Sequence, residues 1–293
     1  MKAILFSVIF TLLTVITTFA QPLSINIKLD KEEYLTYEPI MLLIEIKNET
    51  NSPVTFHFDP NIDPFNLIVK YKGSRVECHN GGASESFFPT IILNSRSSAF
   101  YYYNMLGLLC CSNSLPHEGM SLEHLIAGDY TVELEYNFGK IIINNTKVNL
   151  DLKSNKLKFK VKKPENTVYK TQIGKYISFM NVKNIHNYQN KELFIKKMNE
   201  IINLDNHSPY SLLAQYQLIM HDELYGKKSE AIKIKKNLCV NYPESFVSLA
   251  GIMYDKKLLS TIVNSQELKG KMIQKLSKKM EESHAKLKYI NRR

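Results

Sequence analysis

Apolar and polar residues alternate along much of the first half of the chain. Ile25, Ile27 and Leu29 alternate with polar residues, and the same period of two recurs over residues 130–136 and 157–161. Successive strand side chains point to opposite faces, so this pattern predicts β-strands with one buried and one solvated face. Further strands are expected over residues 40–46, 54–58, 65–71, 91–93, 100–103 and 141–148, with polar turns between them. Eight or nine short strands without an intervening helix predict an antiparallel β-sandwich over residues 21–163.

Beyond Pro164 the apolar residues recur every three or four positions, which is the period of an α-helix. Ser208 is expected to cap one of these helices, with Pro209 at its first position. The expected inward residues are Phe194, Met198, Ile201 and Ile202; Leu212, Leu213, Tyr216, Ile219 and Met220; and Ala231, Ile234, Leu238 and Cys239. A further helix should begin near Glu244, and another should cover residues 266–290. The pattern predicts an all-α second domain, a hairpin array or bundle, over residues 164–293.

The first twenty residues predict a secretory signal peptide. Lys2 supplies a positive start, residues 4–16 are mostly apolar, and Thr18 and Ala20 place small residues where signal peptidase cleaves. An uncleaved membrane anchor is the alternative, although the apolar run is short for a bilayer span. The mature chain is therefore expected to be exported, to the periplasm, the cell surface or the medium.

Export changes how the four cysteines are interpreted, because disulfides persist outside the cytoplasm. Cys78 can form a disulfide with Cys110 or with Cys111. The alternative is that these cysteines are buried as free thiols. A metal site built from these three cysteines with His79 and His117 is less favoured, because the CxxC or HxxxH spacing is missing.

Three segments of the first half carry a family resemblance. They are YLTYEPIMLLIEIKNETNSPVTF (residues 34–56), FNLIVKYKGSRV (residues 65–76) and AGDYTVELEY (residues 127–136). The order of a Tyr, Glu-Pro, a hydrophobic strand, Asn, a polar turn and Pro-Val is similar to that of bacterial exported immunoglobulin-like domains. BsuPI-type proteinase inhibitor domains have a similar layout. The resemblance implies an immunoglobulin-like sandwich over residues 23–163 and, for function, a binding role. The insertion over residues 78–125 departs from it.

Part of the second half resembles a tetratricopeptide repeat. Gly226, Ala231 and Pro243 match that family's spacing of a turn glycine, a small residue in the second helix and a terminal proline. Ile219 and Asp222 depart from it, since a small residue and an aromatic residue are expected there. The match covers a single degenerate repeat over residues 208–245, so an unrelated helical bundle is the alternative.

The net charge of +10 is concentrated in the second half. Residues 21–163 contain 15 basic and 16 acidic residues, whereas residues 164–293 contain 22 and 12. The C-terminal segment includes Lys271, Lys275, Lys278 and Lys279, which can form a solvated helix face or can attract an anionic lipid or glycan surface. Nucleic acid is a disfavoured partner, because this segment has only two arginines and few aromatic residues for base stacking.

No motif for a nucleophile, a phosphate-binding loop or a dinucleotide-binding loop occurs in the sequence. The triplet His221-Asp222-Glu223 is not expected to form a site, because adjacent helical residues point in diverging directions. Tyr101, Tyr102 and Tyr103 are the best binding candidates on chemistry, since exposed tyrosines stack on sugars or anchor protein partners. The alternative is that these rings are covered.

These patterns together predict a non-enzymatic exported protein of the bacterial cell envelope, without a cofactor, that binds or scaffolds an envelope protein. The loops around residues 78–125 and a groove of the helical domain are the expected contact surfaces. Two alternatives stay open: a proteinase-inhibitor-like module or an enzyme with a dispersed site, and a binder of anionic surfaces or glycans through the C-terminal helix.

Overall fold

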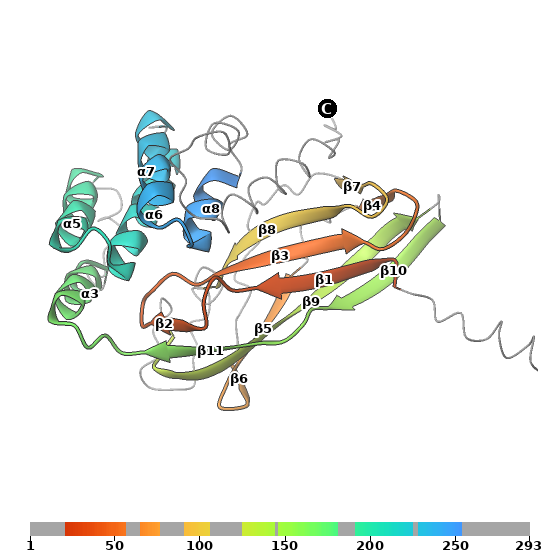
Figure 1. Cartoon of the computed structure of the whole chain (residues 1–293), viewed down its shortest axis with the longest axis horizontal. Coiled ribbons are helices and arrows are strands. Elements are labelled where there is room, and N and C mark those ends of the chain that lie inside the picture. Colours follow the sequence, from red (N-terminus) through yellow and green to blue (C-terminus); the bar gives the residue numbers. More distant parts are fainter. Residues whose placement is uncertain are drawn as a thin grey trace, which may run out of the picture.

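A computed structural model describes residues 21–56, 65–76, 91–105, 125–143, 146–180, 191–224 and 228–253. Within these ranges the N-terminal half consists of strands and the C-terminal half of helices (Figure 1). The change falls between Lys162, where the last strand ends, and Thr167, where the first described helix begins. The described elements are therefore strands in the first half and helices in the second, as the sequence predicts, although Met105, directly after β8, has a helical conformation.

The described strands form two sheets. They are β1 (Leu23–Lys28), β2 (Glu33–Leu35), β3 (Met41–Asn48), β4 (Val54–Phe56), β5 (Phe65–Tyr71), β6 (Ser74–Val76), β7 (Ile91–Leu93), β8 (Ser98–Asn104), β9 (Gly128–Ile143), β10 (Thr146–Lys153) and β11 (Leu157–Lys162). The smaller sheet has the order β1-β3-β8. The larger sheet has the order β2-β11-β9-β4-β7, and β10 and β5 also pair with β9, while β6 pairs with β5.

The pairing of the strands differs from the prediction in two places. β2 pairs with β11 in parallel, so the larger sheet is mixed rather than antiparallel. The single strand expected over residues 141–148 is the end of β9 and the start of β10, which pair as an antiparallel hairpin with Thr146 opposite Ile143. Both segments are rich in β-branched residues, and the period of two cannot show the reversal between them.

Both sheets contribute to one apolar core. Ile25 of β1 and Ile44 of β3 meet Val132 of β9 and Phe159 of β11 in this core, and all four side chains are buried. Tyr130 stacks on Phe159 with ring centroids 5.3 Å apart. In β1, β9 and β11 the residues that alternate with them are polar and less buried, so the period of two in these strands is explained by burial between the sheets.

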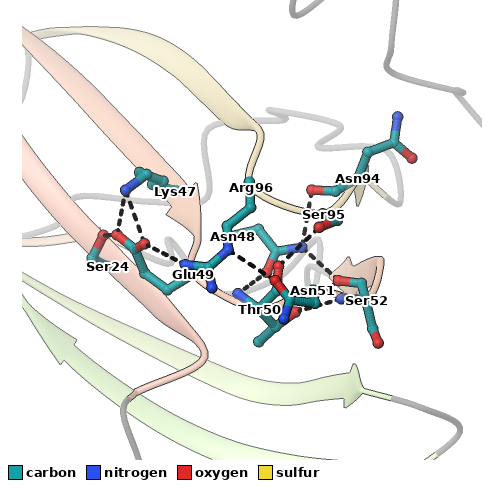
Figure 2. Close-up of polar contacts among 10 residues, drawn as sticks. All are labelled: Ser24, Lys47, Asn48, Glu49, Thr50, Asn51, Ser52, Asn94, Ser95 and Arg96. Carbon is teal, nitrogen blue, oxygen red and sulfur yellow. Dashed lines mark hydrogen bonds and ion pairs between the residues drawn. The ribbon is translucent and has the colours of Figure 1, made fainter.

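Asn48 organises the turn between β3 and β4 (Figure 2). It is fully buried, and its Nδ2 atom donates to the carbonyls of Ser52, Leu93 and Asn94 at 2.8, 3.1 and 3.0 Å. Its Oδ1 atom accepts hydrogen bonds from the Thr50 amide and hydroxyl. One side chain therefore joins the β3–β4 turn to the end of β7.

Five helices are described in the second half: α3 (Thr167–Met180), α5 (Lys191–Leu204), α6 (Pro209–Leu224), α7 (Lys228–Asn241) and α8 (Phe246–Met253). The Ser208 cap is confirmed, because its Oγ atom accepts a hydrogen bond from the Ser211 amide at 2.9 Å. α3 was not expected from the sequence. Met220 was expected to face inward but is 50% exposed.

The helix α8 packs against β3 and β8 on the outer face of the smaller sheet, and the helical half lies at one end of the molecule (Figure 1). Met41 and Leu43 of β3 and Phe100 of β8 belong to one apolar cluster with Leu238 of α7 and Phe246 of α8. We call these five buried residues the interface cluster. Since β3 separates this cluster from the core between the sheets, both faces of β3 are covered.

Polar contacts reinforce this interface between the halves. Asp30, in the β1–β2 turn, accepts hydrogen bonds from the Phe246 amide at 2.9 Å and from the Tyr34 hydroxyl at 2.5 Å. The carboxylate thus satisfies an amide at the start of α8, where negative charge is favourable. Tyr210 of α6 donates to the Thr36 carbonyl at 2.9 Å. Strand and helix halves are therefore joined by apolar packing and by specific hydrogen bonds.

Glu38 lies in the turn before β3 with 3% of its surface exposed. Its carboxylate accepts hydrogen bonds from the Lys31 ammonium and, at 2.8 Å, from the Leu35 amide. Burial raises the pKa of Glu38 above its ordinary value, and the attraction of Lys31 offsets this only in part. Because the folded-state pKa is the higher one, the contribution of Glu38 to stability is lost as the pH rises through it.

Replacing Glu38 by glutamine should therefore change the pH dependence of stability. Below the ordinary carboxyl pKa, Glu38 is protonated in both the folded and the unfolded state. Any advantage of E38Q in the free energy of unfolding should therefore be smallest there. As the pH is raised from about 4 to about 8, the free energy of unfolding of the wild type should fall relative to that of E38Q. Urea unfolding at several pH values measures this difference. A difference independent of pH would contradict the raised pKa.

Candidate functional site

A groove of about 440 Å³ lies between α5, α6 and α7, which are neighbours in the helical half (Figure 1). Its volume is within the range of small-ligand and side-chain pockets. Its apolar lining residues are Ile195, Ile202, Leu218 and Ile234, and its polar lining residues are Asn199, Gln215, Asp222, Glu230 and Asn237. We call this cavity the helical groove.

Helical periodicity explains why these side chains converge. Each helix contributes three lining residues spaced by three and four positions, so each set occupies one face. The sets are Ile195, Asn199 and Ile202 on α5; Gln215, Leu218 and Asp222 on α6; and Glu230, Ile234 and Asn237 on α7. Each helix therefore has an aliphatic and a polar position in the groove.

A chain of amides fixes one wall of the helical groove. Gln215 is 2% exposed and donates to the Ser211 hydroxyl at 3.2 Å. Asn237 donates to the Gln215 carbonyl oxygen at 3.1 Å, and Asn241 donates to the Asn237 carbonyl oxygen at 3.1 Å. The bond between Asn237 and Gln215 joins α7 to α6. On the opposite wall, the side chain of Asn199 on α5 is exposed. Amide groups that offer both a donor and an acceptor suit recognition of a peptide backbone.

Asp222 brings a buried carboxylate to the helical groove, with 6% of its side chain exposed. Its Oδ1 atom lies 3.5 Å from the Nδ1 atom of His221, whose ring stacks on Phe194 with centroids 4.8 Å apart. The other acidic lining residue, Glu230, is half exposed and pairs with Lys233 at 3.0 Å. No lysine or arginine is among the described lining residues, so the groove has an acidic character.

Most residues that the sequence singled out lie outside the described ranges. These are the signal segment 1–20; Cys78, His79, Cys110, Cys111 and His117; Gly226; and Lys271, Lys275, Lys278 and Lys279. Tyr101, Tyr102 and Tyr103 lie in β8, where their backbone pairs with Ile44, Leu43 and Leu42 of β3. The disulfide, the tyrosine site and the basic surface stay predictions.

The described residues contain little that suggests catalysis. No three His, Cys, Asp or Glu side chains within the described ranges are grouped so that they could hold a metal ion. Cys239 is buried, and burial raises the pKa of its thiol to about 12, so the thiol is protonated at neutral pH and is a poor nucleophile. His221 and Asp222 are adjacent on α6 rather than convergent from different elements.

Sequence reasoning missed the residues of the helical groove. It named a groove of the helical half as a contact surface but gave none of its lining residues as a site. A signal was present, because the spacing of three and four residues places each polar residue beside an aliphatic one. Choosing this face required knowing which sides of the three helices face one another.

Comparison with protein-family models and with curated protein sequences found no match. In the part of the chain that the structure describes, none of the helices has both the length and the apolar character needed to span a membrane. Any assignment of function therefore depends on the residues and their geometry.

Proposed function

We propose that the protein is a non-enzymatic binding protein of the bacterial cell envelope that holds a protein partner in the helical groove. The observation that carries this proposal is the groove itself, with aliphatic and hydrogen-bonding side chains from three helices. A surface of mixed aliphatic and amide character fits an extended peptide segment, because such a segment offers side chains and backbone amides together. Export is part of the proposal and is supported by the composition of residues 1–20.

The proposal includes the finer fold assignments. Two facing sheets around one core support an immunoglobulin-like sandwich. The buried Ala231 in α7 supports a tetratricopeptide-like arrangement, because a small residue there lets paired helices approach closely. In this arrangement the sheet half supports the helices through the interface cluster, and the helices bind the partner.

Filling the groove should abolish partner binding. Asn199 is exposed and lines the groove, so Asn199→Trp should occlude it without disturbing the core. Lys196→Trp is the matched control, because Lys196 is exposed on the same helix but does not line the groove. Crosslinking in the native cells, followed by capture of each tagged full-length variant and mass spectrometry, compares them. A specific partner should be recovered with the wild type and K196W and be lost with N199W.

Two results would contradict the proposal. Equal recovery of every partner by N199W and the wild type would exclude the groove as the contact surface. Turnover of a substrate by the purified protein would exclude a purely binding role. Thermal unfolding of both tryptophan variants at the wild-type temperature establishes that a loss of partner is not a loss of fold.

A further inference from the structure

We propose that the helical groove receives a lysine side chain of the partner, with Asp222 as its counter-charge. This inference deepens the proposed function and rests on it. It names the chemistry of the bound segment: a lysine within an extended, otherwise aliphatic peptide.

The first argument is the electrostatic state of Asp222. Its side chain is 94% buried and lines the groove, yet no lysine or arginine among the described residues pairs with it. The contact to His221, at 3.5 Å between adjacent residues, is too long for a strong hydrogen bond. The Asp222 carboxylate therefore lies at the lining of the groove with only this weak neighbour, and it would attract a cationic ligand group.

The second argument is the shape of the lining around this charge. Leu218 lies one turn before Asp222 on α6, and Ile202 and Ile234 complete the aliphatic surface from α5 and α7. A lysine side chain has four methylene groups that pack on aliphatic residues while its ammonium reaches a carboxylate. Asn199, which is exposed on α5, offers a donor and an acceptor to the peptide backbone beside that lysine.

The third argument selects lysine over arginine. The Oδ1 atom of Asp222 already lies 3.5 Å from the Nδ1 atom of His221, so a ligand that needs both carboxylate oxygens would displace this contact. A single oxygen suits the compact ammonium of lysine, whereas arginine gains most when both oxygens accept its planar fork.

The test uses the full-length protein and three probes. They are the peptide acetyl-Leu-Lys-Leu-amide, the same peptide with norleucine in place of lysine, and the free diamine cadaverine. Titration calorimetry or chemical-shift changes give each dissociation constant. The lysine peptide should bind the wild type at least about tenfold more tightly than the norleucine peptide, the usual effect of a hydrogen bond to a charged group.

Variants then assign the difference to one carboxylate. Asp222→Asn keeps the shape of the side chain and removes its charge, so the preference for lysine should disappear in D222N. Glu165→Gln is the matched control, because it removes one exposed carboxylate between β11 and α3, outside the groove lining, and should keep the preference. Thermal unfolding and circular dichroism of D222N verify its fold, and the norleucine peptide provides an internal check because its affinity should not change.

The outcomes separate this inference from the proposed function. If both peptides bind equally and N199W blocks both, the groove is a binding site but the lysine assignment is wrong. If cadaverine binds as tightly as the lysine peptide, the ligand is a free diamine and not a protein segment. If no probe binds at millimolar concentration, the lysine assignment is overturned. The partner capture with N199W then tests separately whether the groove is the partner-binding surface.

Discussion

Replacing Phe246 by alanine should lower the free energy of unfolding by about 3–5 kcal/mol, the usual loss when a buried phenylalanine is truncated in a core. Phe246 is 2% exposed and lies in the interface cluster, where it meets residues of β3 and β8. The truncation would leave a cavity between the sheet half and the helical half, because Phe246 packs between them. The expected effect is therefore both a loss of stability and a weaker coupling of the two halves.

Urea unfolding of the full chain measures both effects. The wild type should unfold in one transition if the interface couples the halves, whereas the variant should show two transitions or a lower apparent slope. Met220→Ala is the control, because Met220 is half exposed on α6 and its truncation should change stability by no more than about 0.5 kcal/mol. A loss below about 1 kcal/mol for F246A would contradict the packing of α8 on the sheet.

The strands with a clear period of two were predictable from the sequence. β1, β5, β9 and β11 each contain buried residues that alternate with less buried ones, so hydrophobicity alone marks them. β2 and β6 were missed because three residues are too few to establish a period. The parallel pairing of β2 with β11 depends on where a turn directs the chain, which the sequence pattern does not encode.

The helix α3 was missed although its signals are present. Asn166 caps it, accepting a hydrogen bond from the Val168 amide at 2.7 Å. Ile173, Tyr176 and Phe179 then recur at intervals of three and are buried against α5 and α6. The helical residues expected from the sequence began only at Phe194, so this pattern was passed over.

The interface between the halves also left a trace in the sequence. Residues 40–44 are five consecutive apolar residues, whereas a strand with one solvated face alternates. The run is apolar because β3 is buried on both faces. Leu42 and Ile44 face the core between the sheets, and Met41 and Leu43 face the helices. The pattern thus indicates that something covers β3, but the helices that cover it are about two hundred residues away along the chain.

Replacing Asn48 by alanine should lower the free energy of unfolding by about 3 kcal/mol, because several buried polar groups lose their partner at once. Three backbone carbonyls lie within 3.1 Å of its Nδ2 atom, and the amide and hydroxyl of Thr50 donate to its Oδ1 atom (Figure 2). Asn48 is fully buried, so water cannot replace these bonds without opening the turn. The loss should include the contact between the β3–β4 turn and β7.

Asn51 provides a matched control from the same turn. Its side chain is exposed and accepts one hydrogen bond, from the Nε atom of Arg96 at 3.1 Å (Figure 2). Asn51→Ala should therefore change stability by no more than about 0.5 kcal/mol. Urea unfolding compares the two variants, and hydrogen exchange of the Thr50 amide reports the turn directly. If N48A and N51A were equally stable, or if the Thr50 amide stayed protected in N48A, the organising role of Asn48 would be wrong. A large loss confined to N48A would mean that the buried hydrogen bonds of Asn48, and not polar side chains of this turn in general, hold the β3–β4 turn against β7.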